Sequence, residues 1–436
     1  MSRRFHHLTL CLFTIGVALA VSSPGYCAQK AWEFYGKVNG MVGDQVISLD
    51  VSGSTVWVGT VYVDPDPEAP LQGGVSLLDP STGNFSTYTP NEGLSFEKVW
   101  DILIDGDRVW FGTPRGLCVL DTKKLAELDP FEVKQAFKTY MPSDGLVAED
   151  VKCLAKSGTV IWYGTNDGLG SLDTSTMKWS QWQVKDGLPA RGIESLAVDG
   201  KIVWVGTSDG LSKFDTEKGT FETIQVPIQG VKVINCVAVH GGSVWVGTRE
   251  GVHVLDQSSG KWTSYGEGDL PDVWITSIGF RDDETWVGTR KGVAIIKGGK
   301  TKVVNEKKGL VSNDVKVVAP AGDYIWIGTA KGLNRYYPGA AAAQMRQMVL
   351  MVSALVAVVA VAVVAKVKFF KPTQEELEKR RQAEEIRAKR KERKRTENPP
   401  WQLCNGVPSK ELCGRCKYNS VKSGKLHCSK YNIDLE

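Results

Sequence analysis

Histidine is scarce in this chain, which narrows the chemistry open to it. Only five of the 436 residues are histidine, and those that follow position 28 are His240, His253 and His427. A Ser/His/Asp triad or a histidine acid–base pair needs a histidine beside a nucleophile or a carboxylate. His240 falls at an expected turn and His253 inside an expected strand, so neither can be placed in such a pair. We therefore expect a protein without enzymatic activity.

Cysteine is also sparse over most of the chain, and the net charge is small. Between residues 29 and 338 the only cysteines are Cys118, Cys153 and Cys236. Three lone cysteines do not build a disulfide framework, and we expect them to be buried, unpaired small residues. The net charge of +4 by itself identifies no class of partner.

What the chain has in quantity is a repeated pentapeptide. Each copy reads aliphatic residue, Trp, aromatic or aliphatic residue, Gly, Thr, except that Thr285 once replaces the aliphatic residue. The seven tryptophans are Trp57, Trp110, Trp162, Trp204, Trp245, Trp286 and Trp326. They lie 53, 52, 42, 41, 41 and 40 residues apart, a period that indicates a repeat architecture.

Each repeat contains four expected strands. In the unit around Trp204 they are Ile193–Val198, Val203–Thr207, Leu211–Asp215 and Phe221–Ile224. Four short antiparallel strands in each of several repeats of ~40–45 residues are typical of propeller blades. Two units are longer, because one has an acidic insert at Val61–Gln72 and another an insert at Lys123–Gln135 that we expect to include a short helix.

The two ends of the array indicate how the ring closes. An aromatic fourth strand precedes the first Trp unit, at Trp32–Tyr35, whereas the last unit has none after Leu333–Tyr337. The simplest explanation is that Trp32–Tyr35 becomes the outer strand of the last blade. We therefore predict an all-β, seven-bladed β-propeller over residues 29–338, with each repeat Trp packed between neighbouring blades rather than lining a ligand box.

Propellers usually bind on the face that carries the turns between strands two and three and the connections between blades. The Thr-x-x-Gly sequences expected at these turns vary in charge, so this face is mixed. The position ten residues before each Trp, near the mouth of the channel, also varies, from Ile47 to Lys316. A solvated mouth without a ligand is the alternative. We predict that the following residues face a ligand: Trp100, Lys152, Glu194, Asn235, Trp274 and Lys316.

The N-terminus has the layout of a secretory signal. Arg3 and Arg4 precede an apolar run from Leu8 to Val21, and small or turn residues follow up to Ala28. We predict a signal peptide over residues 1–28. The alternatives are an uncleaved anchor or a lipid on Cys27.

A second apolar run follows the propeller. Met348 to Ala365 is 18 residues long with Ser353 its only polar residue, enough to span roughly 27 Å at ~1.5 Å per residue. We predict a transmembrane helix over residues 344–366. Lysines and arginines are concentrated after it, so the C-terminus is expected in the cytoplasm of a bacterium and the propeller in the periplasm or outside the cell.

The segment that follows the span is strongly charged. Residues 367–398 are predicted to form a basic juxtamembrane helix, capped by Thr373 with Glu376 three residues on. Without an apolar stripe or interleaved aromatics, a solvated spacer attracted to anionic lipid is a better interpretation than a coiled coil or a nucleic-acid-binding segment.

The last segment, residues 399–436, combines four cysteines: Cys404, Cys413, Cys416 and Cys428. In a reducing compartment, two thiolates in a Cys-x-x-Cys sequence and two more can hold one metal ion tetrahedrally. We predict that these cysteines bind zinc, with an iron–sulfur cluster as the alternative cofactor. The alternative to a metal site is that the four thiols are redox-active or incidental. If a metal is bound, His427 could replace one of the cysteine ligands.

The blade sequence also resembles a known family. Asp199–Asp215 reads Asp-Gly-x-x-Val-Trp-Val-Gly-Thr-x-x-Gly-Leu with Asp four residues on, and is similar to the two-component regulator propeller repeat of extracytoplasmic sensor domains in bacterial hybrid histidine kinases. The resemblance covers about 300 residues, or roughly 70% of the chain, and implies ligand or glycan sensing outside the membrane. No kinase, receiver or DNA-binding sequence follows the span here, which puts the signalling output in doubt.

These expectations combine into one leading hypothesis and two alternatives. The leading one is a single-pass inner-membrane protein whose propeller binds an extracytoplasmic ligand or protein and whose cytoplasmic module binds metal, with a cytoplasmic protein as a further partner. A propeller that only docks envelope partners during assembly is the second. The third is an enzyme, because streptogramin-type lyases have similar repeats, but these need histidine and acidic residues on the binding face.

Overall fold

The computed structural model describes residues 31–62, 69, 71–79, 81–230, 232–369, 372–397, 419–422, 425–428 and 433–435. The predicted signal peptide lies outside these residues, as do the carboxylates of the acidic insert. The chain divides into two compact units, Met1–Met345 and Arg346–Glu436.

The first unit contains seven four-stranded antiparallel sheets, the blades of a propeller. Blade one is β2 (Gln45–Ser52), β3 (Thr55–Tyr62), β4 (Gln72–Leu78) and β5 (Phe85–Tyr88). Blade two is β6 (Asp101–Asp105), β7 (Arg108–Thr113), β8 (Gly116–Asp121) and β9 (Phe137–Tyr140). Blade three is β10 (Val151–Ser157), β11 (Val160–Thr165), β12 (Leu169–Asp173) and β13 (Lys178–Trp182). Blade four is β14 (Ile193–Asp199), β15 (Ile202–Thr207), β16 (Gly210–Asp215) and β17 (Thr220–Ile224).

The remaining blades follow the same order. Blade five is β18 (Cys236–His240), β19 (Ser243–Gly247), β20 (Val252–Asp256) and β21 (Trp262–Tyr265). Blade six is β22 (Ile275–Arg281), β23 (Glu284–Thr289), β24 (Gly292–Lys297) and β25 (Lys300–Val304). Blade seven is β26 (Val315–Ala321), β27 (Tyr324–Thr329), β28 (Gly332–Tyr336) and β1 (Trp32–Tyr35). The expected helix of the second insert forms as α2 (Thr122–Glu127), followed by a short 3-10 turn at Val133–Ala136.

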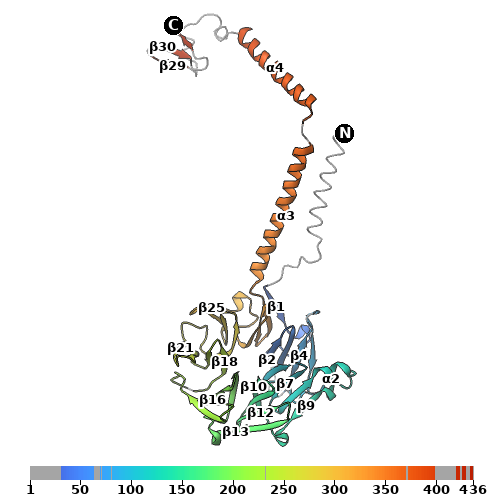
Figure 1. The fold of residues 1–436 in the computed structure, drawn as a ribbon, viewed down its shortest axis with the longest axis vertical. Coiled ribbons are helices and arrows are strands. Elements are labelled where there is room, and N and C mark those ends of the chain that lie inside the picture. Colours follow the sequence, from blue (N-terminus) through green and yellow to red (C-terminus); the bar gives the residue numbers. More distant parts are fainter. Residues whose placement is uncertain are drawn as a thin grey trace. The chain divides into compact units, whose positions relative to one another are not determined.

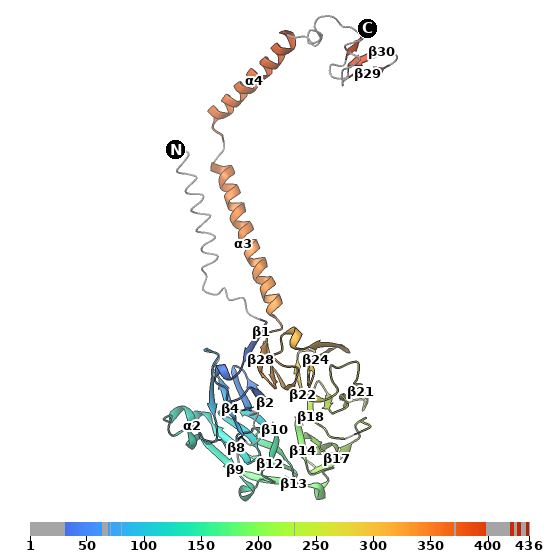
Figure 2. The ribbon, with the colours of Figure 1, turned by 180° about the vertical axis from the view of Figure 1, so that it is seen from behind.

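The ring closes as predicted. Strand β1 pairs antiparallel with β28, with Trp32 opposite Tyr336 and Tyr35 opposite Leu333. The innermost strands contact one another in sequence around the whole ring, and β26 contacts β2 to complete it. In Figures 1 and 2 the inner strands β2, β10, β14, β18 and β22 surround the middle, while β13 and β21 lie at the outside. Both ends of the propeller sequence therefore share one sheet.

Close packing around the second strand of each blade explains the glycine of the repeated pentapeptide. A Cβ atom added to Gly164 would lie 2.5 Å from Cys153 Sγ, and one on Gly59 would lie 2.2 Å from Ser48 Oγ, so only glycine fits these positions. The threonine that follows closes the next turn with its hydroxyl. In blade two, Thr113 Oγ1 donates to Gly116 O at 2.9 Å and accepts from the backbone N–H of Arg115 at 3.1 Å.

The propeller core consists of seven apolar clusters, each between two neighbouring blades. Six of the seven repeat tryptophans are at most 5% exposed, and Trp245 is partly buried. Burying rings of this size supplies much of the apolar contact that holds one blade to the next. The predicted structural role of the tryptophans is confirmed.

The second unit contains most of helix α3 (Ala340–Phe369), helix α4 (Gln374–Glu397) and a small antiparallel sheet of β29 (Asn419–Lys422), β30 (Lys425–Cys428) and β31 (Ile433–Leu435). Thr373 caps α4 through a 3.3 Å hydrogen bond from the backbone N–H of Glu376, as the sequence predicts. Over the described residues, no helix combines the length and the apolar character needed to cross a membrane.

Candidate functional site at the mouth of the propeller

A β-bulge recurs on the inner strand of five of the seven blades and positions one variable side chain in each of the five. In five blades the pairing register shifts between the two residues that flank this position, for example between Val151 and Cys153 around Lys152. In blades two and five the backbone N–H of the residue just before the inner strand donates to the motif glycine. A bulge re-aims a side chain away from the regular alternation of a strand. We call these positions the bulge ring: Ile47, Trp100, Lys152, Glu194, Asn235, Thr276 and Lys316.

The bulge ring lies at the rim that carries the turns between second and third strands and the connections between blades, which we call the mouth rim. Five of the six predicted ligand-facing residues belong to this ring, and the sixth, Trp274, precedes β22 in a blade connection. The structure thus places all six on one rim, while their contact with a ligand stays a prediction. The far rim carries the other hairpin turns and α2.

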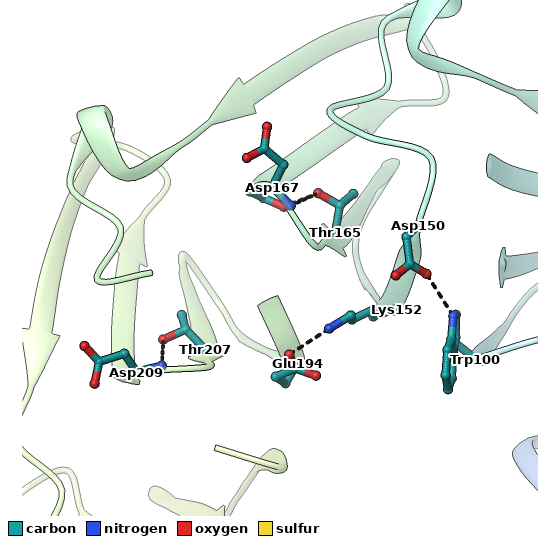
Figure 3. A network of polar contacts seen from close by, with 9 residues as sticks. Trp100, Asp150, Lys152, Thr165, Asp167, Glu194, Thr207 and Asp209 are labelled. Carbon is teal, nitrogen blue, oxygen red and sulfur yellow. Dashed lines mark hydrogen bonds and ion pairs between the residues drawn. The ribbon is translucent and has the colours of Figure 1, made fainter. Parts of the chain in front are cut away.

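Blades two to four carry a polar chain along the mouth rim (Figure 3). Trp100 Nε1 donates to Asp150 Oδ1 at 2.9 Å, and the ammonium of Lys98 lies 3.7 Å from the centre of the Trp100 ring. Lys152 Nζ and Glu194 Oε1 form an ion pair of 2.8 Å between blades three and four, with side chains 26% and 29% exposed. Burial lowers the pKa of Lys98, and the charge of Asp150 partly offsets this effect. These groups are partly desolvated yet remain open to a ligand.

The other predicted residues are engaged within the chain. Asn235 Nδ2 donates to the carbonyl of Ile275 at 2.8 Å, which links blade five to blade six. Lys316 Nζ forms an ion pair of 2.8 Å with Asp314 Oδ2, with the two side chains 28% and 39% exposed. Asn235 thus has a structural role whether or not it also contacts a ligand.

Trp274 contacts two arginines that the sequence pattern did not single out, Arg249 and Arg290. The guanidinium carbons of Arg249 and Arg290 lie 4.3 Å and 3.4 Å from the centre of its ring. Arg249 comes from the turn between β19 and β20, and Arg290 from the turn between β23 and β24. The only hint in the sequence was that both follow the threonine of a Thr-x-x-Gly turn.

A partly buried carboxylate below the bulge ring was also missed. Asp101 Oδ2 accepts a 2.7 Å hydrogen bond from the backbone N–H of Leu154 in the next blade. Burial, with a smaller contribution from the neighbouring Asp50, raises the pKa of Asp101 from 3.8 to about 7, against the lowering effect of two backbone N–H donors. Asp50 makes the same contact one blade earlier, accepting from Ile104 at 2.7 Å, and its pKa is also raised by burial.

The cysteines and histidines of the propeller have structural surroundings. Cys118 and Cys153 are buried and unpaired as predicted, whereas Cys236 is partly exposed, and burial raises the pKa of all three thiols. His253 is 5% exposed with Nδ1 2.8 Å from Ser264 Oγ, and His240 stacks on Phe280. Raised thiol pKa values disfavour the thiolate that a cysteine nucleophile requires.

The mouth rim is also hollowed where blades one and seven meet. A cavity of about 540 Å³ lies there, outside the bulge ring itself. Its lining residues are Asp44, Gln45, Val61, Tyr62, Ala330 and Lys331.

The predicted metal site cannot be placed in the same way. Cys404, Cys413 and Cys416 lie outside the described residues, and Cys428 ends β30, where it pairs with Asn419. Within the described ranges, no three histidine, cysteine or acidic side chains are grouped to hold a metal ion. The metal ligand set stays a prediction.

Comparison with known proteins identifies the fold. No protein-family model matches the sequence. No curated protein matches it either. Among solved structures, the extracellular domain of the hybrid two-component system BT3049 from B. thetaiotaomicron aligns with a TM-score of 0.56 and 18% identity, covering 70% of this chain and 41% of that one. The extracellular domain of BT4673 from the same bacterium aligns with a TM-score of 0.55 and 19% identity, covering 70% and 40%.

A third structure comes from a different system. PorZ, an essential surface component of the type-IX secretion system of Porphyromonas gingivalis, aligns with a TM-score of 0.54 and 17% identity, covering 69% of this chain and 48% of its own. The chain thus spans less than half the length of each of these three structures. The predicted resemblance is confirmed at the level of the fold: this propeller has the fold of the extracellular domains of two-component systems.

Proposed function

We propose that the protein is an extracytoplasmic, membrane-anchored propeller that binds a ligand or a protein partner at its mouth rim. The observation that carries the proposal is the bulge ring, because equivalent positions of the seven inner strands, five of them at a β-bulge, present side chains of six different types at one rim. If this rim had only a structural role, its equivalent positions would not need to differ as Lys152, Glu194 and Trp100 differ from Ile47 and Thr276. We further propose binding without catalysis, since the histidines and thiols of the propeller serve packing.

The proposal predicts that the Lys152–Glu194 pair contributes to ligand affinity. A propeller fragment of residues 29–338 is screened by thermal unfolding against saccharides, amino acids, nucleotides and fractionated envelope extract. Replacing both residues with alanine is expected to weaken binding of any ligand found at least tenfold, which corresponds to ~1.4 kcal/mol, because two partly desolvated charged groups are removed from the site.

A matched control is available on the far rim. Lys201 and Glu217 form an exposed ion pair there, with side chains 68% and 62% exposed, and their double alanine variant should bind as the parent does. Equal loss in both variants, or a ligand that tolerates the Lys152–Glu194 change, would mean that the mouth rim is not the binding site.

A second candidate is an envelope assembly protein that docks partners without signalling. The fold shared with PorZ favours it, since that protein is a surface component of a secretion system. The screen separates the two candidates, because a sensor binds a small molecule from the panel, whereas a docking protein binds only the protein fractions of the extract.

We also propose that α3 anchors the protein in the inner membrane and that the four C-terminal cysteines bind zinc in the cytoplasm. Support for the anchor is that the large apolar side chains described between Met345 and Val364 are 44–69% exposed on every side of the helix, which leaves apolar surface for lipid. Support for zinc is the donor set itself, four thiols of which two are in Cys-x-x-Cys.

One labelling experiment tests both parts. Cells that produce the full chain are treated with a membrane-impermeant maleimide, with a variant in which the four C-terminal cysteines are serine as the control. The thiols are expected to react only after the membrane is permeabilised and only after a chelator is added, because the membrane and the metal each protect them. Labelling of intact cells contradicts the topology, and labelling without chelator, with less than one metal per chain, contradicts the metal site.

A further inference from the structure

Two guanidinium groups from consecutive blades meet on one indole at the mouth rim. Arg290 of blade six lies 3.4 Å and Arg249 of blade five 4.3 Å from the centre of the Trp274 ring. The two turns are equivalent, since Thr248 and Thr289 each close theirs through the same hydrogen bond to a glycine carbonyl. The cluster is therefore built from regular parts of the fold.

No ion pair among the described residues balances the positive charge of this cluster. Both arginines are exposed, and neither forms an ion pair with any residue that the structure describes. The nearest carboxylate in sequence, Glu250, is occupied by the backbone N–H groups of Gln229 at 3.1 Å and Gly230 at 2.6 Å. Asp272, in the same blade connection as Trp274, makes no ion pair among the described residues.

The cation–aromatic contact between Lys98 and Trp100, also on this rim, is different in that respect. Lys98 lies over Trp100, but Asp150 accepts the indole N–H of that ring and interacts favourably with the lysine. Each contact of a guanidinium with an exposed aromatic ring contributes only ~0.5–1 kcal/mol, and two like charges held together repel. An anion between them would relieve that repulsion.

Arginine is suited to this role because its planar fork binds an oxyanion through two parallel N–H donors. Among the described residues, neither guanidinium donates a side-chain hydrogen bond, so their N–H groups remain available beside the Trp274 ring. Lys291, beside Arg290, and Lys331, in the corresponding turn of blade seven, extend the positive sector. The turns of blades three and four carry Asp167 and Asp209 instead (Figure 3).

We propose that Arg249, Trp274 and Arg290 form an anion subsite of the mouth rim, and that the ligand or partner carries a carboxylate, sulfate or phosphate group that this subsite binds. The inference rests on the proposed binding function of that rim. It assigns the acidic end of the ligand to blades five and six and leaves its neutral or basic part for the acidic turns of blades three and four.

The test uses the full chain in detergent at low salt, with sulfate, inorganic phosphate and acetate as separate probes in isothermal calorimetry. Saturable binding of at least one probe is expected, and R249Q/R290Q should weaken it at least tenfold. R249K/R290K should recover part of it, since lysine keeps the charge but not the fork. R115Q, in the corresponding turn of blade two, is the matched control and should leave it unchanged.

The outcomes separate this inference from the proposed function. Absence of saturable binding, or equal binding by the parent and R249Q/R290Q, overturns the anion subsite. So does equal weakening in R115Q, because binding would then reflect general surface charge. If a neutral ligand from the screen still depends on Lys152 and Glu194 while these anions do not bind, the binding function stands and only the subsite is wrong.

Discussion

Replacing Tyr35 with alanine is expected to lower the free energy of unfolding of the propeller by about 3 to 5 kcal/mol, the range for loss of a large aromatic core side chain. Tyr35 lies on the closing strand β1 and is only 6% exposed. Its ring packs edge-on against Phe85 of blade one at 5.9 Å and stacks on Trp326 of blade seven at 6.0 Å between centroids. The substitution therefore weakens the contact that joins the first and last blades.

The neighbouring residue provides the control. Phe34, on the same short strand, is 48% exposed, so Phe34→Ala should cost less than about 1 kcal/mol by lost burial. Unfolding of both variants by urea is followed by tryptophan fluorescence and circular dichroism, and their midpoints are compared with that of the parent. Equal midpoints for the two variants would show that closure does not depend on the interior face of β1.

Replacing Asp101 with asparagine is expected to remove a loss of stability that the parent shows between pH 4 and pH 8. Because the pKa of Asp101 rises from 3.8 to about 7 on folding, the folded state binds the proton more tightly than the unfolded one. Stability is thus highest below the unfolded pKa and falls as the pH rises through the folded pKa. At ~1.4 kcal/mol per pKa unit, and allowing for solvent at this partly exposed side chain, the loss is about 2 to 3 kcal/mol.

Asparagine keeps an oxygen that can accept from Leu154 and carries no charge at any pH. The measurement is the urea midpoint of the parent and of Asp101→Asn at intervals from pH 4 to pH 8. Asp129→Asn, at an exposed position on the loop after α2, should follow the parent curve. A parent whose stability rises over this range, or a variant that runs parallel to it, would contradict the assigned burial of the Asp101 carboxylate.

The fold could be predicted from the sequence because the information is local and repeated. Strand bounds in the unit around Trp204 differ from the prediction by at most one residue at each end. Closure by Trp32–Tyr35 could be predicted because one aromatic fourth strand precedes the first Trp unit and none follows the last. Finding this mismatch needs no knowledge of packing. The predicted transmembrane span, residues 344–366, coincides with α3, but among the described residues no helix is both long and apolar enough for a membrane crossing.

The candidate site could be predicted only in part. Counting ten residues back from each Trp found the bulge ring, although the bulge itself is invisible in sequence. The position nine residues before each repeat Trp is usually a small residue, such as Ser48, Cys153 or Ser195. Asp101 is the single carboxylate at this position, so the sequence did contain a signal that would have identified it. The meeting of Arg249 and Arg290 could not, because they are 41 residues apart and converge only when two blades are side by side.

Only three residues, Tyr337 to Gly339, separate β28 from α3, and Ala340 at the start of that helix is 2% exposed. Any mechanical pull transmitted along α3 therefore loads blade seven first. Blade seven is also the blade that β1 completes by pairing with β28, so such a pull would load the pairing that closes the ring. The blade that would receive this tension also carries Lys316 of the bulge ring, so the proposed membrane anchor and the mouth rim meet in one sheet.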